Sequence, residues 1–245
     1  MGKHLCIDCG NSRIKAAVFA SGEIVSHEVT DYDHLAPVCN LARSSDVSAA
    51  LLTSTTERTG IVVEALKPLL SCELNELSHS TPLPLSLAYH TPETLGRDRI
   101  AAAVGAWQMF TGCNLLVVDA GTCVTMDVVT ADGTFVGGNI APGVEMRLRA
   151  MHRFTSRLPL VDADGDVPLL GYDTATALRS GAVQGVACEV DGLVLKLQAL
   201  LRQLKVFVTG GSARLLAGVM AQSGYTVEPD LVLHGLDAIM TFNEE

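Results

Sequence analysis

The sequence lacks a long apolar run and a concentration of basic charge. No stretch approaches the roughly 18 apolar residues that a membrane-spanning helix needs, and Asp8 interrupts the apolar start of the chain. We therefore expect no membrane association and no signal peptide, and we expect a cytoplasmic protein. Lys and Arg total 17 against 27 Asp and Glu, for a net charge of −10. Because a nucleic-acid footprint needs a basic face, no nucleic-acid partner is expected.

Several catalytic signatures are also missing. The chain has no G-x-S-x-G elbow, no H-E-x-x-H helix and no Walker A lysine motif, and its histidines are scattered. Its seven cysteines are odd in number and scattered, which favours reduced thiols. Cys6 and Cys9 form a C-x-x-C, but no second ligand pair is visible, and residues three apart on a strand point to opposite faces. We expect no zinc or redox site there.

What the sequence does contain is the pattern of an α/β protein. Hydrophobic residues make up 48% and charged residues 18%, as in a globular domain. Strand patterns cover residues 4–8, 13–20, 23–30, 48–55, 85–90, 114–119, 124–130, 134–137 and 205–209. Helical patterns cover residues 100–109, 174–204 and 213–220. Strands followed by helices, twice over, indicate α/β architecture.

The second half of the chain repeats the first. Shifted by 111 residues, Ile7–Asn11 falls on Val118–Thr122, and Gly22 falls without a gap on Gly133. Both copies read as strand, Asp-x-Gly turn, strand, glycine turn, strand. This pattern predicts two duplicated domains, residues 1–112 and 113–245. The alternative is two unrelated hairpins that share ordinary turn chemistry.

The repeated Asp-x-Gly turns are candidate phosphate-binding loops. Glycine lets backbone amides approach phosphate oxygens, and a carboxylate at a strand end can hold Mg²⁺ directly or through water. The first copy runs from Asp8 to Ser12 with Lys15 nearby, and the second from Asp119 to Thr122. Two such loops facing each other could clamp one polyphosphate and its cation. Taken alone, either loop could equally be a plain hairpin.

Three further segments could complete a site. Val208–Ala213 is a strand, two glycines and a helix, which would let a flat adenine or ribose lie against the backbone. Gly137–Gly143 suggests a fixed loop that frames a pocket or forms a hinge. At the start of the helix near residue 100, Asp98 could act as a general base in phosphoryl transfer and Arg99 as an anion clamp. The alternative for Asp98 is ordinary helix N-terminal charge.

Together these motifs resemble the type III pantothenate kinases of the acetate and sugar kinase/actin superfamily. The resemblance extends from Asp8 to about Gly211 and rests on DCGNSRIK, LGRDR, DAGTCVTMD, GGNIAPG and VTGG in that order. Ser12 departs from the family, which often has Thr there, but it keeps the hydroxyl. Arg97 occupies a variable position. The resemblance implies an actin-like ATPase fold, in which two duplicated ribonuclease H-like α/β domains surround a central nucleotide cleft.

The resemblance also implies a reaction and its site. ATP and pantothenate would give 4′-phosphopantothenate and ADP, the first step of coenzyme A biosynthesis. The ATP phosphates and Mg²⁺ would be held by Asp8, Cys9, Gly10, Asn11, Ser12, Arg13, Ile14, Lys15 and Thr122. A monovalent cation, K⁺ or NH₄⁺, would bind Asp119. Pantothenate would bind Gly96, Arg97, Asp98, Arg99, Tyr89 and Thr174, with Asp98 as the catalytic proton acceptor.

The family is dimeric, and the helix predicted over residues 174–204 is the expected interface, because Gly181, Gly185 and Gly192 would permit close helix approach. Simple packing within the chain is the alternative for these glycines. Two other functions stay open at this point. One is a related kinase of another small hydroxylated metabolite, and the other is a non-catalytic regulatory protein on the same fold.

Overall fold

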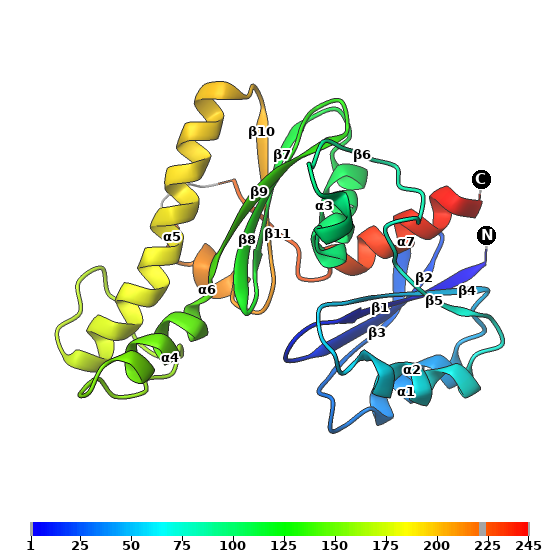
Figure 1. Cartoon of the computed structure of the whole chain (residues 1–245), viewed down its shortest axis with the longest axis horizontal. Helices are drawn as coiled ribbons and strands as arrows, with labels where there is room; N and C mark the ends of the chain where they lie inside the picture. The colour runs from blue at the N-terminus through cyan, green and yellow to red at the C-terminus, as the bar shows by residue number, and fades with distance from the viewer. Residues whose placement is uncertain (1, 221–223, 245) are drawn as a thin grey trace. The chain divides into compact units, whose positions relative to one another are not determined.

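The computed structural model describes residues 2–220 and 224–244, and the chain divides into two compact units (Figure 1). Unit 1 comprises Met1–Thr111, Gly133–Phe135 and Asp230–Glu245, and unit 2 comprises Gly112–Asp132 and Val136–Pro229. The two domains expected from the sequence, 1–112 and 113–245, stay a prediction, and their outermost residues lie outside the described part. The packing units differ from them because residues 133–135 and the C-terminal helix pack with the first half.

Unit 1 is built on a five-stranded mixed sheet in the order β3-β2-β1-β4-β5. Its strands are β1 (Lys3–Cys9), β2 (Ile14–Ala20), β3 (Glu23–Thr30), β4 (Ala49–Ser54) and β5 (Leu74–Glu76). The first three pair antiparallel, whereas β4 runs parallel to β1 and β5 parallel to β4. Alternate residues of β1, among them Leu5 and Ile7, pack in a core with α1 (Ala36–Ser44) and α2 (Thr59–Leu66). A short 3-10 turn, η1 (Lys67–Leu69), follows α2.

The other face of this sheet carries α7 (Leu231–Glu244), which packs on β1 and on α3 (Arg97–Met109). His4 alternates with Leu5 along β1, and its Nδ1 lies 2.7 Å from Oδ1 of Asp237 in α7. The two helices meet closely at glycine, because a Cβ at Gly235 would collide with the carbonyl oxygen of Ala101. This packing fixes α3, and with it the residues of its first turn, relative to β1.

The second sheet has the order β11-β10-β7-β8-β9-β6. Its strands are β6 (Ser86–Leu87), β7 (Asn114–Ala120), β8 (Cys123–Val129), β9 (Thr134–Pro142), β10 (Leu204–Thr209) and β11 (Thr226–Val227). The pairing of β6 with β9 involves Thr134 and Phe135, which belong to unit 1. In unit 2, α4 (Val144–Phe154), α5 (Thr174–Leu200) and α6 (Ala213–Ala217) share an apolar core with β7, β8 and β10.

The two sheets share one topology, which confirms the duplicated α/β fold. The order β3-β2-β1-β4-β5 in the first matches β9-β8-β7-β10-β11 in the second, strand for strand. Gly22 and Gly133, which the 111-residue shift superimposes, both have φ of +82°. A left-handed turn at this point favours glycine, so the sequence match reflects a shared backbone requirement.

Five of the expected boundaries or assignments are wrong by more than one residue. The helix expected to end at residue 204 ends at Leu200, because Leu201 takes an extended conformation; Gln203 then has a left-handed φ of 51° where the chain turns into β10. The helix expected from residue 100 begins at Arg97, and the one expected to reach residue 220 ends at Ala217. The strand expected over 85–90 covers only Ser86–Leu87. Gly137–Gly143, expected as a loop, continues β9 as far as Pro142.

Candidate active site

A polar turn follows the first strand of unit 1. Residues 10–13 connect β1 to β2, and residues 11–13 are exposed. The hydroxyl of Tyr32 donates a hydrogen bond of 2.7 Å to the carbonyl oxygen of Gly10, which fixes the base of the turn. Backbone amides of an exposed turn anchored in this way can bind an anion.

Polar side chains line up beside this turn on one face of the sheet. In the strand register, Asp8 of β1 pairs with Lys15 of β2 and with Thr53 of β4. Side chains of paired residues project to the same face, so these three are neighbours. Thr53 is fully buried, and its hydroxyl has no hydrogen-bond partner among the described residues. Such a hydroxyl costs about 1–3 kcal/mol of stability, so the fold alone gives no reason for its presence.

The carboxylate of Asp98 lies in the first turn of α3. Burial raises the pKa of this carboxyl, and the backbone N–H of Arg99 and the charge of its guanidinium lower it by less. Gly96, the residue that precedes the helix, leaves room for it: a Cβ there would stand 2.6 Å from Oδ1 of Asp98. A carboxylate with a raised pKa is a better proton acceptor than an ordinary one.

Arg99 is buried beside two aromatic rings, with 7% of its surface exposed. Its guanidinium carbon lies 5.8 Å from the ring centre of Tyr89 and 5.9 Å from that of Phe135. The two rings are themselves 6.1 Å apart and meet edge to face. The structure thus brings together Tyr89 and Arg99, two of the residues predicted to bind one substrate.

Two further residues, Arg97 and Thr174, are also predicted to bind the substrate. Arg97 lies beside His79, with 3.1 Å between its Nη2 and the ring Nε2, and its buried Nε has no partner among the described residues. Thr174 is exposed at the start of α5 in unit 2. It is not part of the capping box of that helix, which Asp173 and Thr176 form.

The second Asp-x-Gly loop lies in unit 2, between β7 and β8. Asp119 is partly buried near the end of β7, and Thr122 is exposed in the turn. The N–H of Gly143 donates to the carbonyl oxygen of Thr122 (3.1 Å), so the start of α4 packs on this turn. A Cβ at Gly143 would collide with the same turn, which explains the glycine there.

The Gly-Gly turn after β10 lies directly beside this second loop. β10 pairs parallel with β7, so Thr209 lies next to Asp119. Gly210 has φ of +89°, and a Cβ on it would collide with Oδ1 of Asp119. The N–H of Ser212 donates to the carbonyl oxygen of Ala120 (2.9 Å). Two motifs far apart in the sequence therefore pack together around the Asp119 carboxylate.

No three His, Cys, Asp or Glu side chains gather as a ready-made metal site in the part of the chain that the structure describes. A Mg²⁺ ion carried by a nucleotide would keep several waters and bind one or two carboxylates together with the phosphates. Asp8 and Asp119 each supply one such carboxylate next to a glycine turn. Among the described residues, no helix is long and apolar enough to cross a membrane.

Sequence reasoning missed three side chains that shape these sites: Tyr32, Thr53 and Phe135. Tyr32 and Phe135 had no motif signal, since their roles depend on a hydrogen bond and a ring contact between distant segments. Thr53 follows the apolar strand residues Leu51 and Leu52 and could have been noticed as a polar residue in a buried run. Its position beside Asp8 needed the strand register.

The family model and the similar known proteins that match this chain carry the same family description. Residues 4–196 match the family described as Type III pantothenate kinase. A protein of that description from Phocaeicola vulgatus is 39% identical over 248 residues, covering 99% of both chains. Another, from Bacteroides fragilis, is 40% identical over 243 residues, covering 98% of both chains.

Solved structures share the fold at low sequence identity. A Campylobacter jejuni protein described as a Baf family transcriptional activator has a TM-score of 0.62 at 20% identity, with 98% of both chains covered. The activator of 2-hydroxyisocaproyl-CoA dehydratase from Clostridium difficile, with bound ADPNP, has a TM-score of 0.56 at 13% identity, covering 99% of this chain and 95% of that one. A glucokinase from an Antarctic psychrotroph has a TM-score of 0.50 at 13% identity, with 99% of both chains covered.

Proposed function

The chain belongs to the type III pantothenate kinase family, and on that basis we propose that it transfers the γ-phosphate of ATP to pantothenate, giving 4′-phosphopantothenate and ADP. The observation that carries the proposal is a relationship of about 40% identity along the whole chain, together with the intact carboxylates Asp8, Asp98 and Asp119. A regulatory protein with a decayed site would have no reason to keep all three.

In this proposal the turn after β1 binds the phosphates of ATP. Backbone amides of residues 10–13 and the side chains of Asn11 and Ser12 would contact phosphate oxygens, with Lys15 as a nearby positive charge. Thr122, in the second loop, stays a further predicted ATP-binding residue. Asp8 would hold Mg²⁺, which when bound neutralises charge on the transferred phosphoryl group. The fixed Gly10 carbonyl supports this reading, because a phosphate nest must keep its shape.

Asp98 would act as proton acceptor for the attacking hydroxyl of pantothenate. As the hydroxyl oxygen bonds to the γ-phosphorus and the bond to the ADP oxygen breaks, the hydroxyl proton passes to the Asp98 carboxylate. Arg99 would face the anionic substrate, and Gly96, Arg97 and Tyr89 of the same unit would also contact it. Thr174 stays a further predicted pantothenate-binding residue. The pKa of Asp98, raised by burial, supports this role.

A monovalent cation, K⁺ or NH₄⁺, would bind at Asp119. The Gly210 turn lies against this carboxylate, because a Cβ on Gly210 would collide with Oδ1 of Asp119, so any cation held by Asp119 would also lie beside that turn. We expect Asp119→Ala to abolish the K⁺ response of turnover while the protein stays folded. Steady-state rates in K⁺ and in Na⁺ at equal ionic strength measure this, and an unchanged K⁺ dependence would remove Asp119 from the site.

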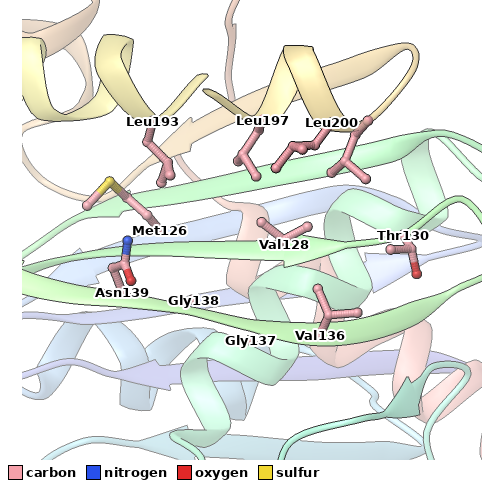
Figure 2. A pocket seen from close by; sticks show the side chains of 11 residues that line it. Met126, Val128, Thr130, Val136, Gly137, Gly138, Asn139, Leu193, Leu197 and Leu200 are labelled. Carbon is pink, nitrogen blue, oxygen red and sulfur yellow. The ribbon is translucent and has the colours of Figure 1, made fainter. Parts of the chain in front are cut away.

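We also propose a homodimer that pairs through α5. Gly181 and Gly192 of this helix have no other atoms near the position of a Cβ, so another chain could approach them. Further along, Leu193, Leu197 and Leu200 point toward β8 and β9 and line an apolar groove of about 370 Å³ (Figure 2). Leu195 and Leu200 are 59% and 79% exposed, which also supports burial against a partner. Sedimentation of the wild type and of Leu195→Lys tests this, because the charged variant should be monomeric.

The decisive test of the function is release of ADP by the purified protein with ATP, Mg²⁺ and pantothenate, in K⁺ or in Na⁺. Turnover that needs both pantothenate and K⁺ would establish substrate and cation together. Turnover on another hydroxylated metabolite, and none on pantothenate, would show that the substrate is that other metabolite.

The seven free thiols are typical of cytosolic proteins and support a cytoplasmic enzyme.

A further inference from the structure

Phe135 is a buried aromatic residue beside the proposed pantothenate site, and the reaction chemistry gives it no direct role. It has no exposed surface and no polar side-chain atom, so it cannot contact a substrate. Its ring lies 5.9 Å from the guanidinium carbon of Arg99 and 6.1 Å from the ring of Tyr89. All three residues belong to unit 1.

Backbone hydrogen bonds hold the segment before Tyr89 to the strand that carries Phe135. The N–H of Ser86 donates to the carbonyl oxygen of Gly133 (3.0 Å), and the N–H of Ala88 donates to that of Phe135 (2.9 Å). The next residue after Ala88 is Tyr89. The position of the Tyr89 ring therefore depends on the same residue whose side chain contacts Arg99.

A long arginine side chain loses considerable conformational entropy when it is fixed, and it needs neighbours that hold its plane. Aromatic rings within about 6 Å of the charge provide such a neighbour through cation–π attraction. An aliphatic residue at position 135 would fill space without a ring quadrupole. The fully buried ring of Phe135 is thus suited to orient the Arg99 guanidinium from within the core.

We propose that Phe135 is a positioning residue for substrate recognition, which fixes Arg99 by its ring and Tyr89 by its backbone carbonyl. The inference rests on the proposed function, in which Arg99 and Tyr89 bind pantothenate. Its consequence is selective: loss of the ring should weaken pantothenate binding and leave ATP binding unchanged.

The test uses the full-length enzyme and the variant Phe135→Leu. We expect the KM for pantothenate to rise about tenfold, in the range that loss of a desolvated cation–π contact gives, while the KM for ATP stays within about twofold. Phe19→Leu is the matched control, because Phe19 is also a fully buried strand residue of unit 1 that meets a ring edge to face, that of His234. This control should melt at a lower temperature than the wild type, and its KM for pantothenate should be unchanged.

A second variant covers the case in which Phe135→Leu does not fold. Ala88 is exposed, so Ala88→Pro removes its N–H donor to Phe135 while every core side chain stays in place in the sequence. It should raise the KM for pantothenate several-fold at nearly unchanged melting temperature. An unchanged KM in either folded variant would overturn the proposal.

A double variant separates this inference from the function on which it rests. Arg99→Lys keeps the charge but loses the planar group, so Phe135→Leu should have little further effect in that background. If Arg99→Lys raises the KM for pantothenate and Phe135→Leu alone does not, the positioning role is wrong while the function stands. If the wild type does not phosphorylate pantothenate at all, the proposed function fails first.

Discussion

The carboxylate of Asp98 lies where burial and local positive charge oppose each other, and burial has the larger effect on its pKa. A general base works only when it is deprotonated, and a raised pKa keeps the proton on Asp98 up to a higher pH. We therefore expect the rate on the acid side to fall at a higher pH than an ordinary aspartate would impose. Turnover measured from pH 4 to 8 tests this, and a profile that stays flat down to the usual aspartate range would contradict it.

Replacement of the same residue separates chemistry from folding. We expect Asp98→Asn to lose about 10²-fold in kcat, the usual scale for a general base, while ATP binding is kept. A folded-state pKa above the unfolded value means that the ionised carboxylate destabilises the fold as pH rises through that pKa. The neutral amide should therefore melt at the same or a higher temperature at pH 7. Near-normal turnover would remove Asp98 from the mechanism.

Thr53 gives a second prediction for a single residue. Thr53→Val replaces a buried hydroxyl that has no partner in the described residues by a methyl group of similar size. Stability should be unchanged or higher by about 1 kcal/mol. Because the hydroxyl lies beside Asp8, we expect turnover to fall in the same variant. Urea denaturation and steady-state kinetics check the two halves, and a clear loss of stability would show that the hydroxyl has a structural partner.

Among the helices and strands, the contact between α3 and α7 is the packing that most directly holds a site residue in place. Gly235→Ala would push a Cβ into the carbonyl oxygen of Ala101, so the helices must separate. We expect a loss of about 3 kcal/mol of stability, as for a strongly overpacked core. Gly60→Ala in α2 is the control: nothing lies near its Cβ position, and it should stabilise unit 1 by up to about 1 kcal/mol. Equal melting temperatures for the two variants would contradict this account.

The sequence predicted what depends on local pattern. The strand–turn–strand repeat, the turns at Gly22 and Gly133, and the helix beginning near Asp98 all have signals within a few residues of themselves. The course of Gly137–Gly143 was misjudged, because glycine and proline normally break a strand, and only pairing with neighbours shows that β9 continues. The contact between Asp119 and Gly210 could not be predicted from the sequence either, since it depends on the parallel pairing of β10 with β7.

At the scale of the whole chain, the first strand and the last helix are joined by a cluster of charged groups. Nδ1 of His4 lies 2.7 Å from Asp237, and its Nε2 lies 3.1 Å from Glu244. The hydrogen bond to Asp237 has the largest effect and raises the pKa of His4, although burial opposes it. The first strand and the last helix are thus linked within unit 1, and no local pattern in the sequence could indicate this contact.

This cluster predicts a pH dependence of stability. A histidine with a raised folded-state pKa contributes stability that is fully present below its unfolded pKa of 6.5 and is lost as pH rises through the folded-state value. Across that window the slope is at most about 1.4 kcal/mol per pH unit. His4→Gln should lack this slope, and Asp237→Asn should weaken it although the imidazole remains. Urea denaturation from pH 5.5 to 8.5 measures the three curves, and curves that run parallel would show that His4 does not bind an extra proton in the folded protein.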